Sequence, residues 1–271
     1  MFNLLTSFAP IKGDWGLMQQ VAAYSFSLLQ DCKVFVLGND DGASQICQQY
    51  GFIHIPNVKV GKDIGVSTSN GIVLGDAFEK VKEQINEGVV LFINGDNVIV
   101  PSVLYSDNSS IDESFQKMND YFKGDFCGWG RRNEVYDYNN LKQIQSIEKS
   151  YEYTVKLFEE KKSKRIQYGI DLYIWSYSAF NKMELLSVLI DGWHYDNWLG
   201  HVPYQLSKNV VYLTDIIETI HYQHPESSNR QQNEARESTL YNKKLIQQYF
   251  PNLDIFKLKT PKTFKEIIDV R

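Results

Sequence analysis

The run from Val89 to Val100 constrains the fold most, because it reads Val-Val-Leu-Phe-Ile and then meets the polar turn Asn94-Gly95-Asp96. A strand that is apolar at every position is typical of the middle of an α/β sheet, where both faces are covered by helices. In open sheets of this kind, ligands bind beyond the carboxyl ends of the strands. We therefore expect Asp96 to face a ligand.

Strand-like and helix-like segments alternate up to residue 100, which is the pattern of a mostly parallel sheet with covering helices. The expected strands are 2–7, 33–37, 53–55 and the run from 89, and the expected helices are 14–29, 42–50 and 73–84. Later segments predict helices at 111–122, 177–189 and 232–249, and strands at 126–129, 169–175 and 210–214, with a polar, Tyr-rich section of acceptor loops between 129 and 169. No repeat or linker divides the chain, so we expect one α/β domain over residues 1–271.

Charge and cysteine content limit the partners and the compartment. The net charge is -5, whereas proteins that bind nucleic acid usually carry a clustered basic surface, so we expect no nucleic acid partner. The three cysteines are odd in number and lack metal-like spacing, which favours a reducing, cytoplasmic location. The longest apolar run is far short of the roughly 20 residues that span a bilayer. Any contact with a membrane would therefore be peripheral, and the aromatic and basic stretch 255–259 is the candidate for it. An ordinary edge strand or tail is the favoured interpretation of that stretch.

Asp96 is the main candidate for a metal ligand. Mg²⁺ and Mn²⁺ prefer carboxylate oxygen, and they need few protein ligands when phosphate groups supply the rest. Asp96 follows a buried strand directly, which suits that task. Asn94 is neutral and would position the turn, a ribose or a water molecule. Because Asn and Asp are favoured in any turn, an ordinary turn is the alternative for this motif alone.

Asp196 is the candidate general base. It stands between Trp193 and Trp198, whose rings could form an apolar wall beside a sugar or a base. A carboxylate that is removed from water has a raised pKa and becomes a better general base. The alternative is an aspartate that caps a helix beginning near Asn197.

Two histidines, His221 and His224, follow a late strand at a spacing of three. Such a pair can ligate a metal or contact a phosphate, although paired histidines are more often structural. The missing third soft ligand argues against a zinc site. We favour His221 over His224 as a second ligand of the cation held by Asp96.

Arg131 and Arg132 follow Gly-Trp-Gly at a strand end. Arginine presents a fork of donors that matches phosphate oxygens, so either side chain could neutralise a phosphate, and we expect one of them to point to solvent. Asp171 lies in a hydrophobic strand, where a carboxylate needs a partner or a function. It is therefore a candidate for binding an acceptor hydroxyl.

The order of these segments resembles the GT-A nucleotide-diphospho-sugar glycosyltransferases, in particular small bacterial and viral-type enzymes. The match covers most of the chain, and it is the order and spacing of short motifs that is specific. The segments that carry it are Leu-Thr-Ser-Phe at 5–8, Gln-Gln-Val-Ala-Ala-Tyr-Ser at 19–25, Val-Leu-Gly-Asn-Asp-Asp-Gly at 36–42, Ile-Asn-Gly-Asp at 93–96, Gly-Trp-Gly-Arg-Arg at 128–132, Gly-Ile-Asp-Leu-Tyr at 169–173, Tyr-Asp-Asn-Trp-Leu at 195–199 and Ile-His-Tyr-Gln-His at 220–224.

The resemblance implies a role for several residues. The side chains at the end of the first strand would line the nucleotide pocket, and these are Thr6, Ser7 and Phe8. Asp40 would approach the base or the ribose. Asp96 would be the last acid of an Asp-x-Asp-like motif that holds a divalent cation, Mn²⁺ or Mg²⁺, on the diphosphate. Asn94 takes the place of the first acid, which leaves one carboxylate where many relatives have two.

The implied fold is GT-A, a mostly parallel Rossmann-like sheet flanked by helices, with a smaller acceptor-side subregion. Residues 1–100 would form the nucleotide-binding half, and 101–271 the acceptor-binding half with the C-terminal helix. The implied activity is hexosyl or pentosyl transfer from a UDP-, GDP- or dTDP-sugar to a glycan or glycolipid, as in polysaccharide biosynthesis. We expect inversion at the anomeric carbon, with Asp196 as the base and His221 beside the metal.

Two other functions stay open. A nucleotidyltransferase shares the sheet and the metal-binding acid, but it usually carries a glycine-rich, basic loop after the first strand, and residues 7–16 are too sparse in glycine and lysine for that. A non-catalytic nucleotide- or carbohydrate-binding protein would keep the sheet without turnover, and Asn94 in place of an acid is its best support. A dinucleotide-binding dehydrogenase is excluded, because Gly-x-Gly-x-x-Gly is absent after the first strand.

Overall fold

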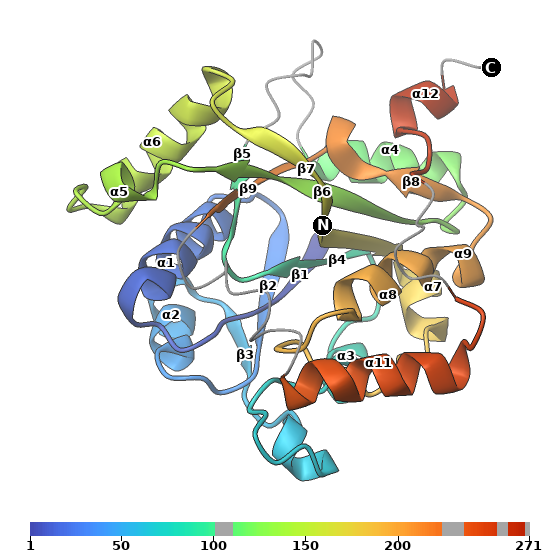
Figure 1. Ribbon diagram of the computed structural model, residues 1–271. Helices are drawn as coiled ribbons and strands as arrows, with labels where there is room; N and C mark the ends of the chain where they lie inside the picture. Colours follow the sequence, from blue (N-terminus) through green and yellow to red (C-terminus); the bar gives the residue numbers. More distant parts are fainter. Residues whose placement is uncertain (101–110, 224–235, 254–259, 269–271) are drawn as a thin grey trace.

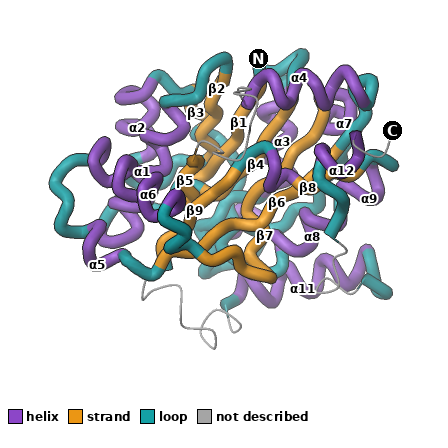
Figure 2. The backbone as a smooth tube through the Cα atoms, turned by 90° about the horizontal axis from the view of Figure 1, so that it is seen from above, coloured by secondary structure: helices purple, strands orange, loops and turns teal. Residues whose placement is uncertain are grey.

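Nine strands form one sheet in the computed structural model, which describes residues 1–100, 111–223, 236–253 and 260–268. The strand order is β3-β2-β1-β4-β7-β6-β9-β5, with β8 alongside β6, and the sheet curls as it is followed across (Figures 1 and 2). The strands are β1 (Phe2–Ser7), β2 (Cys32–Leu37), β3 (Ile53–Ile55), β4 (Val89–Asn94), β5 (Asn97–Val100), β6 (Cys127–Val135), β7 (Lys164–Ser176), β8 (Val210–Tyr212) and β9 (Glu218–Tyr222). Strands β1 to β4 are parallel to one another, whereas β7 runs antiparallel to both of its neighbours.

Helices cover both faces of the sheet (Figure 2). One hydrophobic cluster contains the apolar sides of α1 (Gly13–Ser27), α2 (Ala43–Tyr50), α4 (Ile111–Tyr121) and α6 (Ile147–Glu159). A second cluster, on the other face, contains those of α3 (Leu74–Lys82), α7 (Tyr177–Lys182), α8 (Tyr195–His201) and α11 (Glu237–Tyr249). The short elements are η1 (Gly61–Ile64), α5 (Tyr138–Leu141), α9 (Pro203–Leu206), η2 (Leu213–Asp215) and α12 (Phe264–Ile268). The expected α/β class, with a central sheet flanked by helices, is confirmed.

Strand β4, which contains the apolar run from Val89 to Ile93, is buried on both faces, as the sequence predicts. Val89, Leu91 and Ile93 belong to one hydrophobic cluster, and Val90 and Phe92 belong to the other. Both faces of β4 are therefore buried, since side chains alternate between the faces of a strand. The strand ends at Asn94, as the polar turn predicts, and after the turn the chain continues as β5 at the far edge of the sheet, beyond β9.

Gly95 allows this turn to lie directly against the end of β1. A Cβ atom at this position would lie 2.4 Å from the carbonyl oxygen of Ser7 and 2.6 Å from the ring of Phe8. A backbone oxygen cannot move aside as the end of a flexible side chain can, so only glycine fits. The close approach brings the turn and the end of β1 to the same edge of the sheet.

The section between residues 129 and 169, expected to consist of loops, instead contains α5, α6 and the first part of β7. Leu157 of α6 is buried, and Ile147, Tyr151 and Phe158 pack against the core at helical spacing, so this section carries the apolar pattern of a helix. The helix expected at 177–189 ends at Lys182. His221 lies inside β9 rather than after a strand, while His224 and the stretch 255–259 lie outside the described residues.

Within the described part of the chain, no helix is both long enough and apolar enough to cross a membrane.

Candidate active site

A cavity of about 2010 Å³ opens at the carboxyl ends of the first parallel strands. Ser7 and Phe8 reach it from β1, Asp40 from the loop after β2, and Asn94 from the end of β4. The opposite wall is formed by the segment 190–197 and by one side of α11. The cavity therefore lies where ligands bind in open α/β sheets.

The cavity gathers most of the residues that the sequence singled out. Those that line it are Ser7, Phe8, Asp40, Asn94, Asp96, Arg132, Asp171, Trp193, Asp196 and His221. Thr6 and Trp198 are buried in the protein interior instead. Arg131 packs against the ring of Trp129, with its guanidinium carbon 5.3 Å from the ring centroid, so Arg132 alone of the two arginines reaches the cavity.

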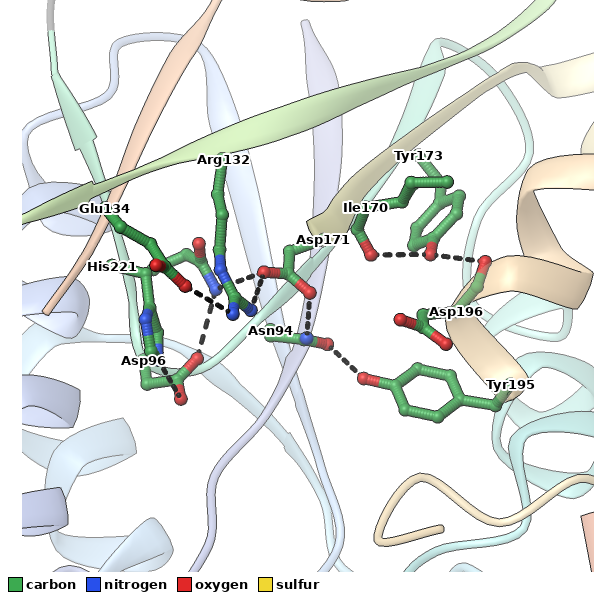
Figure 3. A network of polar contacts seen from close by, with 11 residues as sticks. Asn94, Asp96, Arg132, Glu134, Ile170, Asp171, Tyr173, Tyr195, Asp196 and His221 are labelled. Atoms are coloured by element: carbon green, nitrogen blue, oxygen red, sulfur yellow. Dashed lines mark hydrogen bonds and ion pairs between the residues drawn. The ribbon is translucent and has the colours of Figure 1, made fainter. Parts of the chain in front are cut away.

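Asp96 and His221 form a pair at one side of the cavity (Figure 3). The Nε2 atom of His221 lies 3.4 Å from Oδ2 of Asp96, and the side-chain amide of Asn97 donates to Oδ1 of Asp96 at 3.0 Å. The pairing of β5 with β9 creates this contact, because Asn97 lies opposite His221. Over the ranges that the structure describes, no group of three His, Cys, Asp or Glu side chains is arranged to hold a metal.

Arg132 is held between two carboxylates rather than presented to solvent. Its guanidinium donates to Asp171 at 2.5 Å and to Glu134 at 3.0 Å. Burial opposes the charge, but Asp171 and the neighbouring carboxylates outweigh it and raise the pKa of Arg132 above its usual range. The arginine is therefore always charged, and much of its charge is neutralised inside the protein.

A bulge in β7 places Asp171 at this point. Gly130 of β6 pairs with Leu172, but the next residue of β6 pairs with Ile170. Asp171 is thus an extra residue on β7, and such bulges redirect side chains near functional sites. Asn94 lies one residue beyond the last pairing of β4 with β7, which sets it opposite Asp171 on the same face. Asp171 is only 3% exposed.

The polar network continues from Asp171 toward α8 (Figure 3). The amide nitrogen of Asn94 donates to Asp171 at 2.8 Å, and the hydroxyl of Tyr195 donates to the amide oxygen of Asn94 at 2.9 Å. The hydroxyl of Tyr173 lies 2.8 Å from two carbonyl oxygens, those of Ile170 and Asp196. These contacts tie the first residues of α8 to β4 and β7.

Asp196 faces the cavity from the first turn of α8. Burial, followed by the nearby charge of Asp171, raises the pKa of Asp196 to about 6. The residue in the capping position is His194, which has a left-handed backbone with φ of 77°. Non-glycine residues with such φ angles are uncommon and cluster at functional sites. Asp196 therefore lies inside the helix rather than in the cap position, and its raised pKa lies near neutral pH.

The cavity also contains a carboxylate that the sequence did not single out. Asp191 accepts hydrogen bonds from the hydroxyl of Ser69 at 2.9 Å and from the backbone N–H of Gly71 at 3.3 Å. Burial, and then the charge of Asp191, raises the pKa of Asp40. The Asp-Gly pair at 191–192 was the only sequence signal, and it reads as a plain turn.

Asn242 of α11 supports the segment that carries Trp193 and leads into α8. Its side-chain oxygen accepts from the backbone N–H of Leu189 at 2.8 Å, and its amide donates to the carbonyl oxygens of Leu189, Gly192 and Trp193 at 2.8, 3.2 and 3.1 Å. The side chain is fully buried. One residue of α11 thus fixes a whole turn of the cavity wall.

We expect Asn242→Ala to lower the free energy of unfolding by about 2–4 kcal/mol, because it leaves several buried backbone groups without a partner. Chemical denaturation monitored by circular dichroism measures this. Gln248→Ala is the matched control, since Gln248 is exposed on the same helix, and it should change stability by no more than about 0.5 kcal/mol. Equal effects of the two substitutions would contradict the bracing role of Asn242.

No family model matches the chain, and no curated protein matches it in sequence. Among solved structures the chain is similar to S. aureus TarS, with 12% identity over 93% of this chain and a TM-score of 0.49. M. tuberculosis glucosyl-3-phosphoglycerate synthase is 12% identical over 94% of this chain and 82% of its own, with a TM-score of 0.45. The galactosyltransferase LgtC, in complex with donor and acceptor sugar analogs, is 12% identical over 90% of this chain and 96% of its own, with a TM-score of 0.38. The chain spans 40% of the length of TarS.

Proposed function

We propose that this chain is a GT-A glycosyltransferase that moves a sugar from a nucleotide-diphosphate donor to a hydroxyl acceptor. One observation carries the proposal. A single cavity at the carboxyl ends of β1, β2 and β4 has the Asp96–His221 pair on one side and Asp196, with its raised pKa, on the other. The first pair suits a diphosphate with its cation, and Asp196 suits the removal of a proton from an acceptor.

Asp196 is the proposed base. In an in-line displacement, the acceptor oxygen forms a bond to the anomeric carbon while the bond from that carbon to the diphosphate oxygen breaks, and the bonding electrons leave with the nucleoside diphosphate. The acceptor proton passes to Asp196. A base whose pKa of about 6 lies near neutral pH is deprotonated in the cell and still basic enough to take that proton. Attack from the side opposite the leaving group inverts the anomeric configuration.

The charges around the cavity fit a divalent cation. The network of Figure 3 contains one arginine, Arg132, and four carboxylates, those of Asp96, Glu134, Asp171 and Asp196, so a diphosphate beside this network would meet an excess of negative charge. Mn²⁺ or Mg²⁺ would be held by Asp96 and His221, a carboxylate and an imidazole 3.4 Å apart, with phosphate oxygens and water completing the coordination. When bound, the cation neutralises the departing diphosphate.

The remaining cavity residues suggest where the rest of the donor and the acceptor lie. The part of the cavity at the carboxyl ends of β1 and β2 is lined by Ser7, Phe8 and Asp40. We assign these residues to the nucleoside of a UDP-, GDP- or dTDP-sugar. Trp193 lies on the wall next to Asp196, where its ring suits the apolar face of a sugar, so we assign it to a glycan or glycolipid acceptor. The buried, free thiols of Cys47 and Cys127 agree with a cytoplasmic location.

A thermal-shift panel of UDP, GDP, dTDP and CMP, each with and without Mn²⁺, tests the proposal. One nucleotide should raise the melting temperature more with Mn²⁺ than without, because binding to the folded state stabilises it by RT ln(1 + [L]/Kd). The matching sugar donor should then release nucleoside diphosphate in the presence of an acceptor. Stabilisation without release would favour a non-catalytic binding protein, and no response to any nucleotide would contradict the proposal.

Replacing Asp96, the proposed metal ligand, tests the cation site directly. We expect Asp96→Asn to abolish most of the Mn²⁺-dependent part of the nucleotide shift, because an amide oxygen is a much weaker ligand than a carboxylate. Glu152→Gln, the same change at an exposed position of α6, should leave the shift intact. Isothermal titration of Mn²⁺ in the presence of the nucleotide gives the affinities. Undiminished Mn²⁺ binding by the Asp96→Asn protein would remove Asp96 from the site.

A further inference from the structure

We propose that Asn94 is a positioning residue that orients the start of α8, and with it Asp196, through the hydroxyl of Tyr195. This inference rests on the function proposed above, in which Asp196 is the base. It gives a new role to the first position of the Asn-x-Asp turn, which the sequence assigned to the nucleotide. Asp96 remains the residue of this turn that faces the cation.

The hydrogen bonds of Asn94 fix its orientation. Its amide nitrogen lies 2.8 Å from Oδ1 of Asp171, and its amide oxygen lies 2.9 Å from the hydroxyl of Tyr195. An ionised carboxylate only accepts hydrogen bonds, so the NH₂ group must face Asp171 and the oxygen must face Tyr195. Both ends of the amide are therefore engaged by protein partners, away from the Asp96–His221 pair (Figure 3).

The same geometry explains why position 94 is an asparagine and not the first acid of an Asp-x-Asp motif. A carboxylate at position 94 would lie within hydrogen-bond distance of the Asp171 carboxylate, without a proton between them, and two like charges this close repel strongly. Asp171 cannot turn away, because Arg132 binds it at 2.5 Å and it is nearly inaccessible to solvent. Asparagine supplies the donor that Asp171 needs and the acceptor that Tyr195 needs.

The link to Asp196 is short. Tyr195 and Asp196 are the first two residues of α8, and the hydroxyl of Tyr173 contacts the carbonyl oxygen of Asp196 at 2.8 Å. The helix start is thus held at two points, one through the Tyr195 side chain and one through the Asp196 backbone. Loss of either contact lets the carboxylate rotate or shift, and small misplacements of a catalytic group lower the rate strongly.

The test compares the turnover of four proteins, wild type, Tyr195→Phe, Asn94→Ala and the double variant, with the sugar donor of whichever nucleotide, UDP, GDP, dTDP or CMP, stabilises the wild-type protein in the thermal-shift panel. We expect Tyr195→Phe to lower kcat by about 3–10-fold, the worth of one hydrogen bond in an ordered site, with the donor KM and the Mn²⁺ dissociation constant unchanged. We expect the double variant to be no slower than Asn94→Ala, because two residues that act through one bond have non-additive effects. The same non-additivity should appear in their unfolding free energies.

Tyr222→Phe is the matched control, since the Tyr222 hydroxyl is also buried and bonds one side chain, Thr154 at 2.7 Å, on the other side of the sheet. It should leave kcat unchanged. A third variant, Asn94→Asp, separates the two roles of the position: we expect slower turnover without tighter Mn²⁺ binding. Tighter Mn²⁺ binding, or additive losses in the double variant, would overturn the inference. Absence of turnover in the wild-type protein would instead contradict the proposed function.

Discussion

Asp196→Asn should lower kcat by about 10²–10⁴-fold, the usual contribution of a positioned general base. The amide has nearly the shape of the carboxylate but cannot take a proton from the acceptor. Nucleotide and Mn²⁺ binding should persist, because Asp96 and His221 are unchanged. Release of nucleoside diphosphate from the sugar donor in the presence of the acceptor measures the effect. Wild-type turnover by this variant would rule out Asp196 as the base, and Glu152→Gln controls for the change of charge.

The pH dependence of the wild-type protein provides a second measurement of the same group. The base must be deprotonated, and the pKa of Asp196 is raised to about 6 by burial and by Asp171. Turnover should therefore rise as the pH increases through about 6 and level off above it. The Asp196→Asn protein should lose this limb of the profile. A wild-type profile that is flat between pH 5 and 7 (about one unit to either side of that pKa) would contradict the assignment.

The raised pKa of Asp196 also predicts that the ionised side chain lowers the stability of the folded protein. The folded state holds the Asp196 proton more tightly than the unfolded state, so stability falls as the pH rises from the ordinary aspartate pKa to about 6, and the cost is complete above that. Asp196→Asn should thus stabilise the protein above pH 6, by on the order of 1 kcal/mol since the group is partly exposed. Thermal unfolding at pH 5 and at pH 8 compares the two proteins.

Arg132→Met should have the largest effect on stability, about 3–5 kcal/mol, the usual cost of removing one partner of a buried ion pair. The substitution leaves the buried Asp171 carboxylate without its strongest donor and frees Glu134 as well. Urea unfolding measures the loss, and turnover should fall with it because Asp171 then no longer fixes Asn94.

Arg131→Met is the control next in sequence. Its guanidinium lies over the Trp129 ring rather than between carboxylates, and a cation–π contact of this kind contributes about 0.5–1 kcal/mol. We therefore expect the two neighbouring substitutions to differ several-fold in their cost. Similar losses would mean that the Arg132–Asp171 pair does not stabilise the folded protein.

The sequence predicted the parallel part of the fold well, because its signals are local. Val89 to Ile93 is apolar at every position, as a strand buried on both faces must be. The prediction missed α6, although Ile147, Tyr151 and Phe158 lie at helical spacing and pack against the core, because the charged residues and tyrosines between them make the segment polar over all. Thr154 has a partner on β9, the hydroxyl of Tyr222 at 2.7 Å. A polar contact between distant segments leaves no periodic signal.

The sequence singled out many of the residues that line the cavity, but it did not show how they are connected. Asp96 and Asp196 were chosen by residue type and position, and the structure brings both to one cavity. The pairing of Asp171 with Arg132 depends on a bulge in β7, and the sequence pattern of a strand does not reveal where its register shifts. The sequence therefore offered Asp171 as a ligand for the acceptor, whereas protein donors already engage both of its oxygens.

The position of β5 sets the order in which the site can be assembled. β5 lies at the end of the strand order, and its ladder partner is β9, more than a hundred residues later in the chain. Asp96 therefore meets His221 only after the chain has been synthesised as far as His221, 125 residues beyond Asp96, and contacts of such long sequence separation form slowly. The nascent protein can build β1 to β4 and their helices first. Any cation affinity due to the Asp96–His221 pair is then acquired only after β1 to β4 have formed, so a chain that has folded only this far would not capture a metal at this site.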